Sequence, residues 1–428
     1  MYRLDPDTGK QKFFAKDGTK SVISAVISIL IGMVVGTLII IFVGLTRANI
    51  STNGMLEGVK LVFLGIFSTG REAGELTFGF NPVNLGNMLF RATPLIMTGL
   101  SVAVAFKTGL FNIGAPGQYL MGTTATLYVA LMIPSDVVPA WLIWILAFLC
   151  GMIAGALWGS IPGILKAYLN INEVITCIMT NWIAANLVTW FIDAREFLKN
   201  SEEGGKVGYV KPTAANGVET FDFGLDKIFP GSQVNGGILI AILMAVIVYI
   251  IISRTTFGYQ LKACGSNRHA AKYAGINDKR SIVASMAIAG ALSAAGASLY
   301  YLSGNTEFFW STYQSLPSEG FNGIPVALLA ANNPIGVVFT GIFMSMLNIA
   351  GTQLRTLTAY NEYITDIIIA AIVYLSAFSM IIRMFIDNAG KRKKEKKQIA
   401  EKPAMAAEAA AAADGEIQTA GAAEGGDK

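Results

Sequence analysis

Side chains that commonly carry out chemistry are scarce in this sequence. The 428 residues include one histidine, His269, and three cysteines, Cys150, Cys177 and Cys264, none within metal-ligand spacing of another. Zinc sites, haem attachment and disulfide frameworks need such groups in closely spaced sets. An enzyme would want a histidine, a cysteine or paired carboxylates within its apolar segments, and none is evident. We therefore expect no catalytic residue, no metal site and no cofactor bound by this chain.

Four ionisable residues lie within or beside apolar segments: Arg91, Lys107, Glu173 and Asp366. Three of them lie close to the end of a segment, and Arg91 has a side chain long enough to extend to the interface. A proton-coupled carrier would need a buried relay of such groups. We expect no relay here.

Neutral amides are more informative, because several interrupt apolar segments. An unpaired amide is costly in hydrocarbon, so each must face a hydrogen-bonding partner or a wet cavity. A wet cavity lined by amides suits an uncharged polar solute, whereas hydrogen bonds to neighbouring helices explain any single amide equally well. The candidate residues for a solute path are Phe111, Asn112, Gln118, Asn181, Asn332 and Asn333.

Two irregular stretches locate this path. Residues 107–118 join two apolar segments with three glycines and a proline, and residues 331–336 contain Asn332, Asn333 and Pro334. Neither stretch can be regular helix throughout. Broken helices at membrane depth are tolerated only where protein or water covers them, and a pair of them indicates a transport site.

The composition places these residues in a membrane protein. The chain is 53% hydrophobic and only 14% charged, whereas about a quarter of a globular protein is charged. A helix needs about 20 apolar residues to cross a bilayer, and one further apolar segment, 321–331, has about half that length. The nine full-length segments are residues 22–45, 83–106, 114–133, 138–165, 174–192, 236–253, 281–302, 334–351 and 363–383.

Basic residues set the predicted orientation. Residues 1–21, the loop 254–280 and the lysine-rich stretch after residue 390 are basic, whereas the segment 194–235 has balanced charge. Basic flanking loops remain in the cytoplasm, so we place the segment 194–235 outside. The basic tail then reaches the cytoplasm only if the segment 321–331 also crosses. The predicted fold is an all-α, polytopic membrane helix bundle of about ten transmembrane helices with both termini cytoplasmic.

The predicted organisation has three parts. Residues 1–21 form a cytoplasmic N-terminus, residues 22–386 the membrane domain, and residues 387–428 a disordered cytoplasmic tail. The lysines of the tail are expected to meet anionic lipid headgroups. The formal net charge of +4 is spread over these segments without a long basic face, so nucleic acid is not an expected partner.

Glycine spacing predicts close helix packing. Gly151, Gly155, Gly159 and Gly163 recur at every fourth residue and so lie on one face of a helix. Small residues on one face let the backbone of a neighbouring helix approach closely. We also predict an interfacial helix at residues 55–67.

The loop 254–280 is the most specific feature of the sequence. Helical character at residues 268–274 is bounded by Gly265 and Gly275, which predicts a short cytoplasmic helix that another protein can contact. The residues expected at this contact are Gly258, Gly265, Asn267, Arg268, Ala270, Ala271 and Gly275.

This loop resembles the cytoplasmic coupling loop of permease subunits of ATP-binding-cassette (ABC) importers, in the branch that handles ribose, branched-chain amino acids and nucleosides. The resemblance extends from about residue 20 to residue 386, apart from much of the outer loop 194–235. The blocks Ala-Thr-Pro-Leu at 92–95 and Gly-Leu-Phe-Asn-Ile-Gly at 109–114 are more similar to nucleoside permeases than to sugar permeases. The family often has glutamate where this chain has Pro116, so a role for that carboxylate does not carry over.

The resemblance implies a heteromeric importer in a bacterial plasma membrane. Its other parts would be a second permease, cytoplasmic ABC ATPase subunits and an extracellular lipid-anchored substrate-binding protein. The chain has no Gly-x-x-x-x-Gly-Lys-Ser/Thr sequence, which cradles nucleotide phosphates, so the partner subunits are expected to use the ATP. The implied cargo is a nucleoside. Ribose or another sugar is the second candidate cargo, and a self-contained channel or carrier is a less favoured reading.

Overall fold

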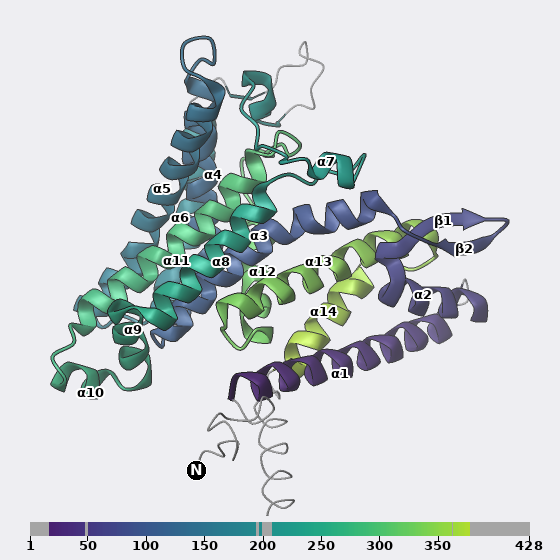
Figure 1. Cartoon of the computed structure of the whole chain (residues 1–428), viewed down its shortest axis with the longest axis horizontal. Helices are drawn as coiled ribbons and strands as arrows, with labels where there is room; N and C mark the ends of the chain where they lie inside the picture. Colours follow the sequence, from purple (N-terminus) through teal and green to yellow (C-terminus); the bar gives the residue numbers. More distant parts are fainter. Residues whose placement is uncertain (1–16, 48–49, 194–196, 199–207, 362, 377–428) are drawn as a thin grey trace, which may run out of the picture. The chain divides into compact units, whose positions relative to one another are not determined.

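The computed structural model describes residues 17–47, 50–193, 197–198, 208–361 and 363–376, and residues 29–376 belong to one compact unit. Its helices and its hairpin follow the order shown in Figure 1. They are α1 (Asp17–Thr46), α2 (Thr52–Leu64), β1 (Ser68–Glu72), β2 (Glu75–Phe78), α3 (Pro82–Lys107), α4 (Ala115–Met132), α5 (Ala140–Leu169), α6 (Glu173–Asp193), α7 (Leu225–Ile228), α8 (Gly237–Arg254), α9 (Thr256–Ser266), α10 (Arg268–Tyr273), α11 (Asp278–Tyr301), α12 (Ser318–Leu329), α13 (Pro334–Leu357) and α14 (Tyr363–Ser376).

Each of the ten predicted membrane segments overlaps a helix, and residues 377–383 of the last segment lie outside the described residues. Among the described residues, seven helices are long and apolar enough to cross a membrane: α1, α3, α5, α6, α8, α11 and α13. The other three predicted crossings, α4, α12 and α14, do not meet both criteria, and α12 has only 12 residues. The number of crossings and the side of each terminus remain predictions. The predicted tail 387–428 and most of the segment 1–21 lie outside the described residues.

Asparagine and proline set the starts of several helices. Asn81 Oδ1 accepts a hydrogen bond from the Asn84 amide at the start of α3, where Pro82 occupies the first turn. Asn333 Oδ1 likewise accepts from the amides of Ile335 and Gly336 at the start of α13. Such caps satisfy amides that have no partner inside the helix, and proline needs none.

The predicted glycine face joins α5 to α11. Gly151, Gly155, Gly159 and Gly163 are all buried. A Cβ added to Gly159 would lie 2.5 Å from the Met286 carbonyl oxygen, and one added to Gly155 would overlap Gly290. The two backbones are therefore in direct contact, which confirms the predicted role of these glycines.

Close contacts also join helices that are distant in the sequence. A Cβ on Gly32 of α1 would lie 2.6 Å from Ile372 of α14, and a Cβ on Gly323 of α12 would lie 2.6 Å from the Thr98 backbone of α3. The helix α3 additionally contacts α8, α11 and α13. This central position makes α3 the helix against which the functional site is assembled.

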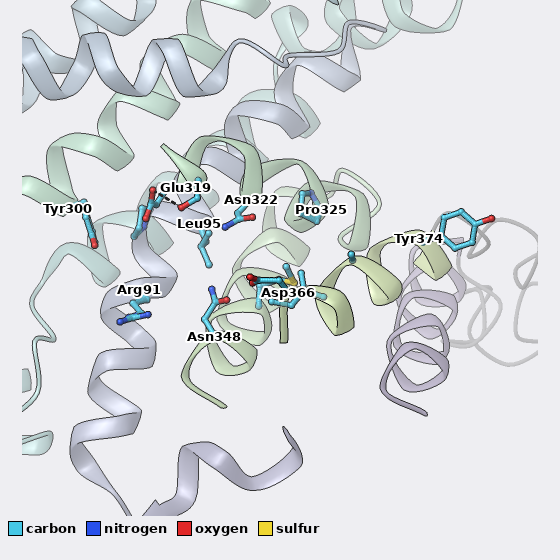
Figure 2. A pocket seen from close by; sticks show the side chains of 14 residues that line it. Arg91, Leu95, Tyr300, Glu319, Asn322, Pro325, Asn348, Asp366 and Tyr374 are labelled. Atoms are coloured by element: carbon cyan, nitrogen blue, oxygen red, sulfur yellow. Dashed lines mark hydrogen bonds between the residues drawn. The ribbon is translucent and has the colours of Figure 1, made fainter. Parts of the chain in front are cut away.

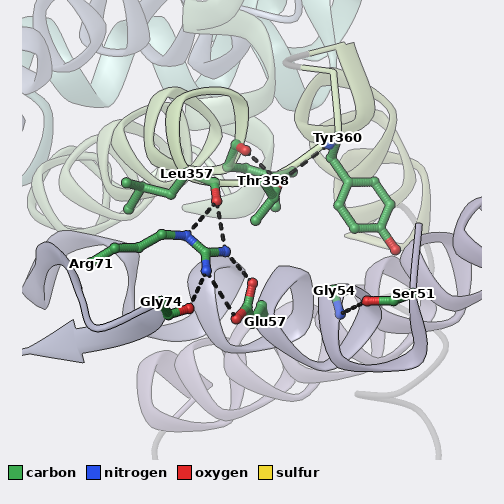
Figure 3. A network of polar contacts seen from close by, with 9 residues as sticks. Ser51, Gly54, Glu57, Arg71, Gly74, Leu357, Thr358 and Tyr360 are labelled. Carbon is green, nitrogen blue, oxygen red and sulfur yellow. Dashed lines mark hydrogen bonds and ion pairs between the residues drawn. The ribbon is translucent and has the colours of Figure 1, made fainter. Parts of the chain in front are cut away.

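A β-hairpin between α2 and α3 is a feature that the sequence did not indicate. Strands β1 and β2 pair antiparallel, and Arg71 of β1 anchors the hairpin to two helices (Figure 3). Its guanidinium donates to the Leu357 carbonyl at the end of α13, at 3.0 and 2.9 Å, and forms an ion pair with Glu57 of α2. The predicted helix at 55–67 is present as α2, followed by a short 3₁₀ turn at Gly65–Phe67.

Candidate functional site

A cavity of about 890 Å³ lies among α3, α11, α12, α13 and α14. This volume is within the range of about 300–1,000 Å³ found for small-molecule sites. Figure 2 shows side chains from several of these helices gathered around it. The polar and charged residues of its lining are Arg91, Tyr300, Ser318, Glu319, Asn322, Asn348, Asp366 and Tyr374.

The charged groups come from three different helices. Arg91 projects from α3, whereas Glu319 and Asp366 lie in the first turns of α12 and α14. The positive end of a helix dipole stabilises a carboxylate at such a position. Arg91, whose side chain we expected to extend to the interface, and Asp366, which we placed near the end of its segment, instead line a cavity with Glu319.

Two prolines shape the cavity wall. Pro94 of α3 and Pro325 of α12 both lie inside their helices and line the cavity. A proline lacks the N–H that would bond the carbonyl four residues earlier, so the helix loses a bond there. Nearby hydroxyls bond other carbonyls of these helices: Thr98 donates to the Pro94 carbonyl at 2.9 Å, and Thr340 of α13 donates to the Val326 carbonyl at 2.9 Å.

A smaller cavity of about 190 Å³ shares three residues with the larger one. The shared residues are Arg91, Asn348 and Asp366, which lie between the two cavities as polar parts of both linings. Thr365 also lines the smaller cavity; its side chain is 4% exposed, and its Oγ1 has no hydrogen-bond partner among the described residues. A ligand hydroxyl or a water molecule would satisfy this group.

The predicted path residues Asn112, Gln118 and Asn181 make hydrogen bonds with other residues of the chain. Asn112 Nδ2 donates to Ser101 Oγ and to Gln118 Oε1, and Gln118 Nε2 donates back to Asn112 Oδ1. Asn181 Oδ1 accepts from the Gly117 amide, and Asn181 Nδ2 donates to the Ile113 carbonyl. This amide network fixes the irregular stretch before α4, so hydrogen bonds to neighbouring segments account for these three amides.

The other predicted path residues also lie away from the cavity lining. Phe111 packs on Phe106, with ring centroids 5.2 Å apart. Asn332 and Asn333 form the turn between α12 and α13, where Asn332 has a φ of 56° and a buried Oδ1 with no partner among the described residues. Contact of these six residues with a solute remains a prediction.

One of the two irregular stretches, residues 107–118, contacts the start of α12 next to the cavity, whereas residues 331–336 lie at the other end of α12. Gly320, the residue after Glu319, lies against the start of α4, where a Cβ on Gly320 would be 2.5 Å from Pro116 Cα. Ser101, within α3, bonds Asn112, so the chain runs back beside α3 before α4 begins. The helices α4 and α12 therefore begin at adjacent points, as broken helices do around transport sites.

The loop between α8 and α11 contains the predicted short helix. Asn267 Oδ1 accepts from the Ala270 amide and caps α10, and Arg268 Nε donates to Asp278 Oδ2 at 2.7 Å. Ala271 is buried under the loop, and Gly275 ends the helix with a φ of +82°. The exposed surface of α10 comprises His269, Ala270, Lys272 and Tyr273.

The predicted loop residues therefore differ in what they contact. Gly258 and Gly265 are packed against backbone: a Cβ on Gly258 would overlap the carbonyl oxygen of Ile251, and one on Gly265 would overlap that of Lys107. Asn267, Arg268 and Ala271 fix the shape of α10, and Ala270 is exposed. The surface that another protein can reach also includes Tyr273, which the sequence did not single out.

Comparison with known proteins identifies the class to which this architecture belongs. The family described as branched-chain amino acid transport system, permease component, matches residues 84–377. The nucleoside ABC transporter permease protein NupB of Lactococcus lactis is 37% identical over 329 residues, which cover 73% of this chain and 88% of NupB.

Further relatives extend the comparison. The guanosine ABC transporter permease protein NupP of Bacillus subtilis is 34% identical, over 86% of this chain and 96% of NupP. The glucose ABC transporter permease protein TsgB13 of Haloferax volcanii is 30% identical, over 68% of this chain and 74% of TsgB13. Lactococcus lactis and Bacillus subtilis also contain the permeases NupC and NupQ, which are 24% and 26% identical to this chain. The chain therefore belongs to the permease-component family of ABC transport systems, as a multi-pass plasma-membrane protein and not an enzyme.

Proposed function

We propose that this chain is the membrane-spanning permease subunit of an ABC importer that translocates nucleosides across a bacterial plasma membrane. The observation that carries the proposal is the identity of 34–37% with two nucleoside permeases over most of each chain. The cavity among α3, α11, α12, α13 and α14 would be the translocation site.

The chemistry of the cavity suits a neutral solute with several donors and acceptors. Glu319 and Asp366 can only accept hydrogen bonds when ionised, Arg91 can only donate, and the amides of Asn322 and Asn348 do both. A nucleoside offers ribose hydroxyls and base nitrogens to each of these groups. Tyr300 would supply an aromatic face for the base.

The motor is a separate protein. We assign the exposed surface of α10 to contact with a cytoplasmic ABC ATPase subunit, which would bind and hydrolyse the ATP. The backbone contact of Gly265 with the α3–α4 turn would pass the movement of this loop to the broken helices beside the cavity. ATP bound to the ATPase subunits can shift the helix bundle between inward-open and outward-open states only if the complex binds ATP more tightly in one state than in the other.

The other subunits of the assembly are proposed by analogy with the related transport systems. NupB and NupC in one bacterium, and NupP and NupQ in another, support an ABC system that contains a second permease. An extracellular lipid-anchored binding protein would deliver the cargo. In the predicted topology, with both termini cytoplasmic, the cavity lies toward the outer side, because Arg91 is about 24 Å along α3 from Lys107 at the loop.

Sugar transport is the second candidate function, and the 30% identity to a glucose permease favours it over a self-contained channel or carrier. Nucleoside and sugar import differ in the cargo and share the machinery. A channel or carrier that acts alone would instead move solute without any ATPase.

Uptake by cells tests the proposal. Deleting the gene for this chain should abolish uptake of labelled guanosine, and a plasmid copy should restore it. Excess unlabelled uridine should compete, whereas excess glucose or ribose should not. Competition by a sugar alone would establish the second candidate, and unchanged guanosine uptake in the deletion strain would refute the nucleoside proposal.

A further inference from the structure

The ionisable side chains of the cavity carry an unequal charge. One cation, Arg91, faces two carboxylates, Glu319 and Asp366, so the described lining has a formal net charge of −1. None of the three takes part in the ion pairs found among the described residues, which join Arg71 to Glu57, Lys166 to Glu173 and Arg268 to Asp278. Glu319 Oε2 accepts a hydrogen bond from Ser318 Oγ at 3.2 Å, which leaves the carboxylate charged, so none of the three charges is neutralised by an ion pair among the described residues.

Both carboxylates line the larger cavity. Asp366 lines both the larger and the smaller cavity, together with Arg91 and Asn348. Glu319 stands at the start of α12, next to the contact of Gly320 with Pro116. Thr365, whose buried Oγ1 has no partner among the described residues, is a further polar residue in the lining of the smaller cavity.

We propose that Glu319 and Asp366 make the cavity a charge filter, which admits uncharged nucleosides and excludes their phosphorylated forms. The proposal rests on the proposed function and adds how the site distinguishes nucleosides from nucleoside phosphates. Both classes share the ribose and the base, so amides and aromatic faces cannot separate them.

The filter follows from electrostatics. A phosphate monoester carries about −1.5 to −2 charges at pH 7, and the carboxylates of half-buried Glu319 and exposed Asp366 repel it across the cavity. Arg91 alone can compensate only part of this charge. We expect a 5′-monophosphate to bind at least about a hundredfold more weakly than the nucleoside.

Displacement of labelled guanosine from the purified whole complex, without the external binding protein, tests the filter. This readout reports the nucleoside site and not the ATP sites of the partner subunits. In the wild type, guanosine 5′-monophosphate should need at least about a hundredfold higher concentration than guanosine for half displacement. The dimethyl phosphotriester of the same nucleotide is larger but uncharged, and it should displace within about tenfold of guanosine.

Variants locate the filter. The double variant Glu319→Gln, Asp366→Asn should reduce the ratio between monophosphate and guanosine to about tenfold or less, and each single change should reduce it in part. The control Asp226→Asn removes an exposed carboxylate of α7, outside the cavity lining, and should leave the ratio unchanged.

Several results would overturn the filter. These are equal displacement by guanosine and its monophosphate in the wild type, exclusion of the uncharged triester as strongly as the monophosphate, and an unchanged ratio in the double variant. An equal reduction in Asp226→Asn would also do so. A wild-type complex with no saturable guanosine binding would instead refute the nucleoside function itself, and the filter with it.

Discussion

Gly265 and Gly109 lie in backbone contact: a Cβ on Gly265 would be 2.9 Å from the Gly109 amide nitrogen and would overlap the Lys107 carbonyl oxygen. One glycine belongs to the loop between α8 and α11, and the other to the turn between α3 and α4. Gly109 also has a φ of +74°, which only glycine adopts without strain. The contact joins the surface assigned to the ATPase to the irregular stretch beside the cavity.

Replacing Gly265 by alanine should break this contact. The added Cβ meets backbone atoms, which cannot move aside as a flexible side chain can, so the loop must shift. We expect the variant to lose at least about tenfold in nucleoside-stimulated ATP hydrolysis and to be destabilised by about 1–3 kcal/mol. The measurements are ATPase activity and the Tm of the purified complex.

Gly275→Ala is the matched control for Gly265→Ala. Gly275 has a φ of +82° but no atom within 4 Å of its added Cβ, so the cost is local strain of about 1 kcal/mol. Stimulated hydrolysis should remain. Equal effects of the two substitutions would show that the Gly265 contact has no special role in coupling.

Tyr273 should be part of the surface that binds the ATPase subunit. Its side chain is 94% exposed on α10, and exposed aromatic residues in the centre of an interface often contribute 2 kcal/mol or more to binding, as an order of magnitude. Tyr273→Ala should therefore reduce copurification of the ATPase by about tenfold or more.

Tyr313→Ala is the control for Tyr273→Ala. Tyr313 is 92% exposed, like Tyr273, but it lies after the C-terminal end of α11, whereas α10 lies before the N-terminal end of α11. Copurification should be unaffected by this change. Loss of the ATPase in both variants, or in neither, would argue against α10 as the docking surface.

Arg71 should hold the hairpin to the membrane helices. Arg71→Ala removes two hydrogen bonds to the Leu357 carbonyl and the ion pair with Glu57. The side chain is about one-third exposed, so solvent screening limits the loss to about 1 kcal/mol. Faster proteolysis within residues 68–78 would report the release of the hairpin.

Arg71→Lys separates the roles of charge and geometry. Lysine keeps the charge but cannot make the paired guanidinium contacts. We expect intermediate cleavage in this variant. Cleavage identical to wild type in Arg71→Ala would contradict the anchoring role.

The helices and the loop could be predicted from the sequence, because their signals are local. Long apolar runs indicated the membrane helices, glycine spacing the α5–α11 contact, and Gly275 the end of α10. Gly265, expected to bound α10 on the other side, lies within α9, and Asn267 caps the start of α10 instead. The hairpin had no such signal, since its strands are short and largely exposed, with a bulge between Ser68 and Gly70.

The cavity could not be predicted in the same way. Arg91, Asn348 and Asp366 are far apart in the sequence and meet only because α3, α13 and α14 pack together. An amide such as Asn112 looks the same in sequence whether it bonds Gln118 or faces a cavity. Arg91 was a possible indication, since a charge inside an apolar segment indicates a functional site. Its side chain is also long enough to extend to the membrane interface, and that explained its position without a site.

Transport by the complete complex in proteoliposomes tests the central claim most directly. With ATP available to the ATPase subunits and the binding protein on the opposite side, labelled guanosine should accumulate. Asn348→Leu, which replaces an amide in the lining of both cavities by an apolar group, should lower uptake by at least about tenfold while the complex stays assembled. ATP-independent accumulation, or full uptake by Asn348→Leu, would contradict an ATP-driven path through this cavity.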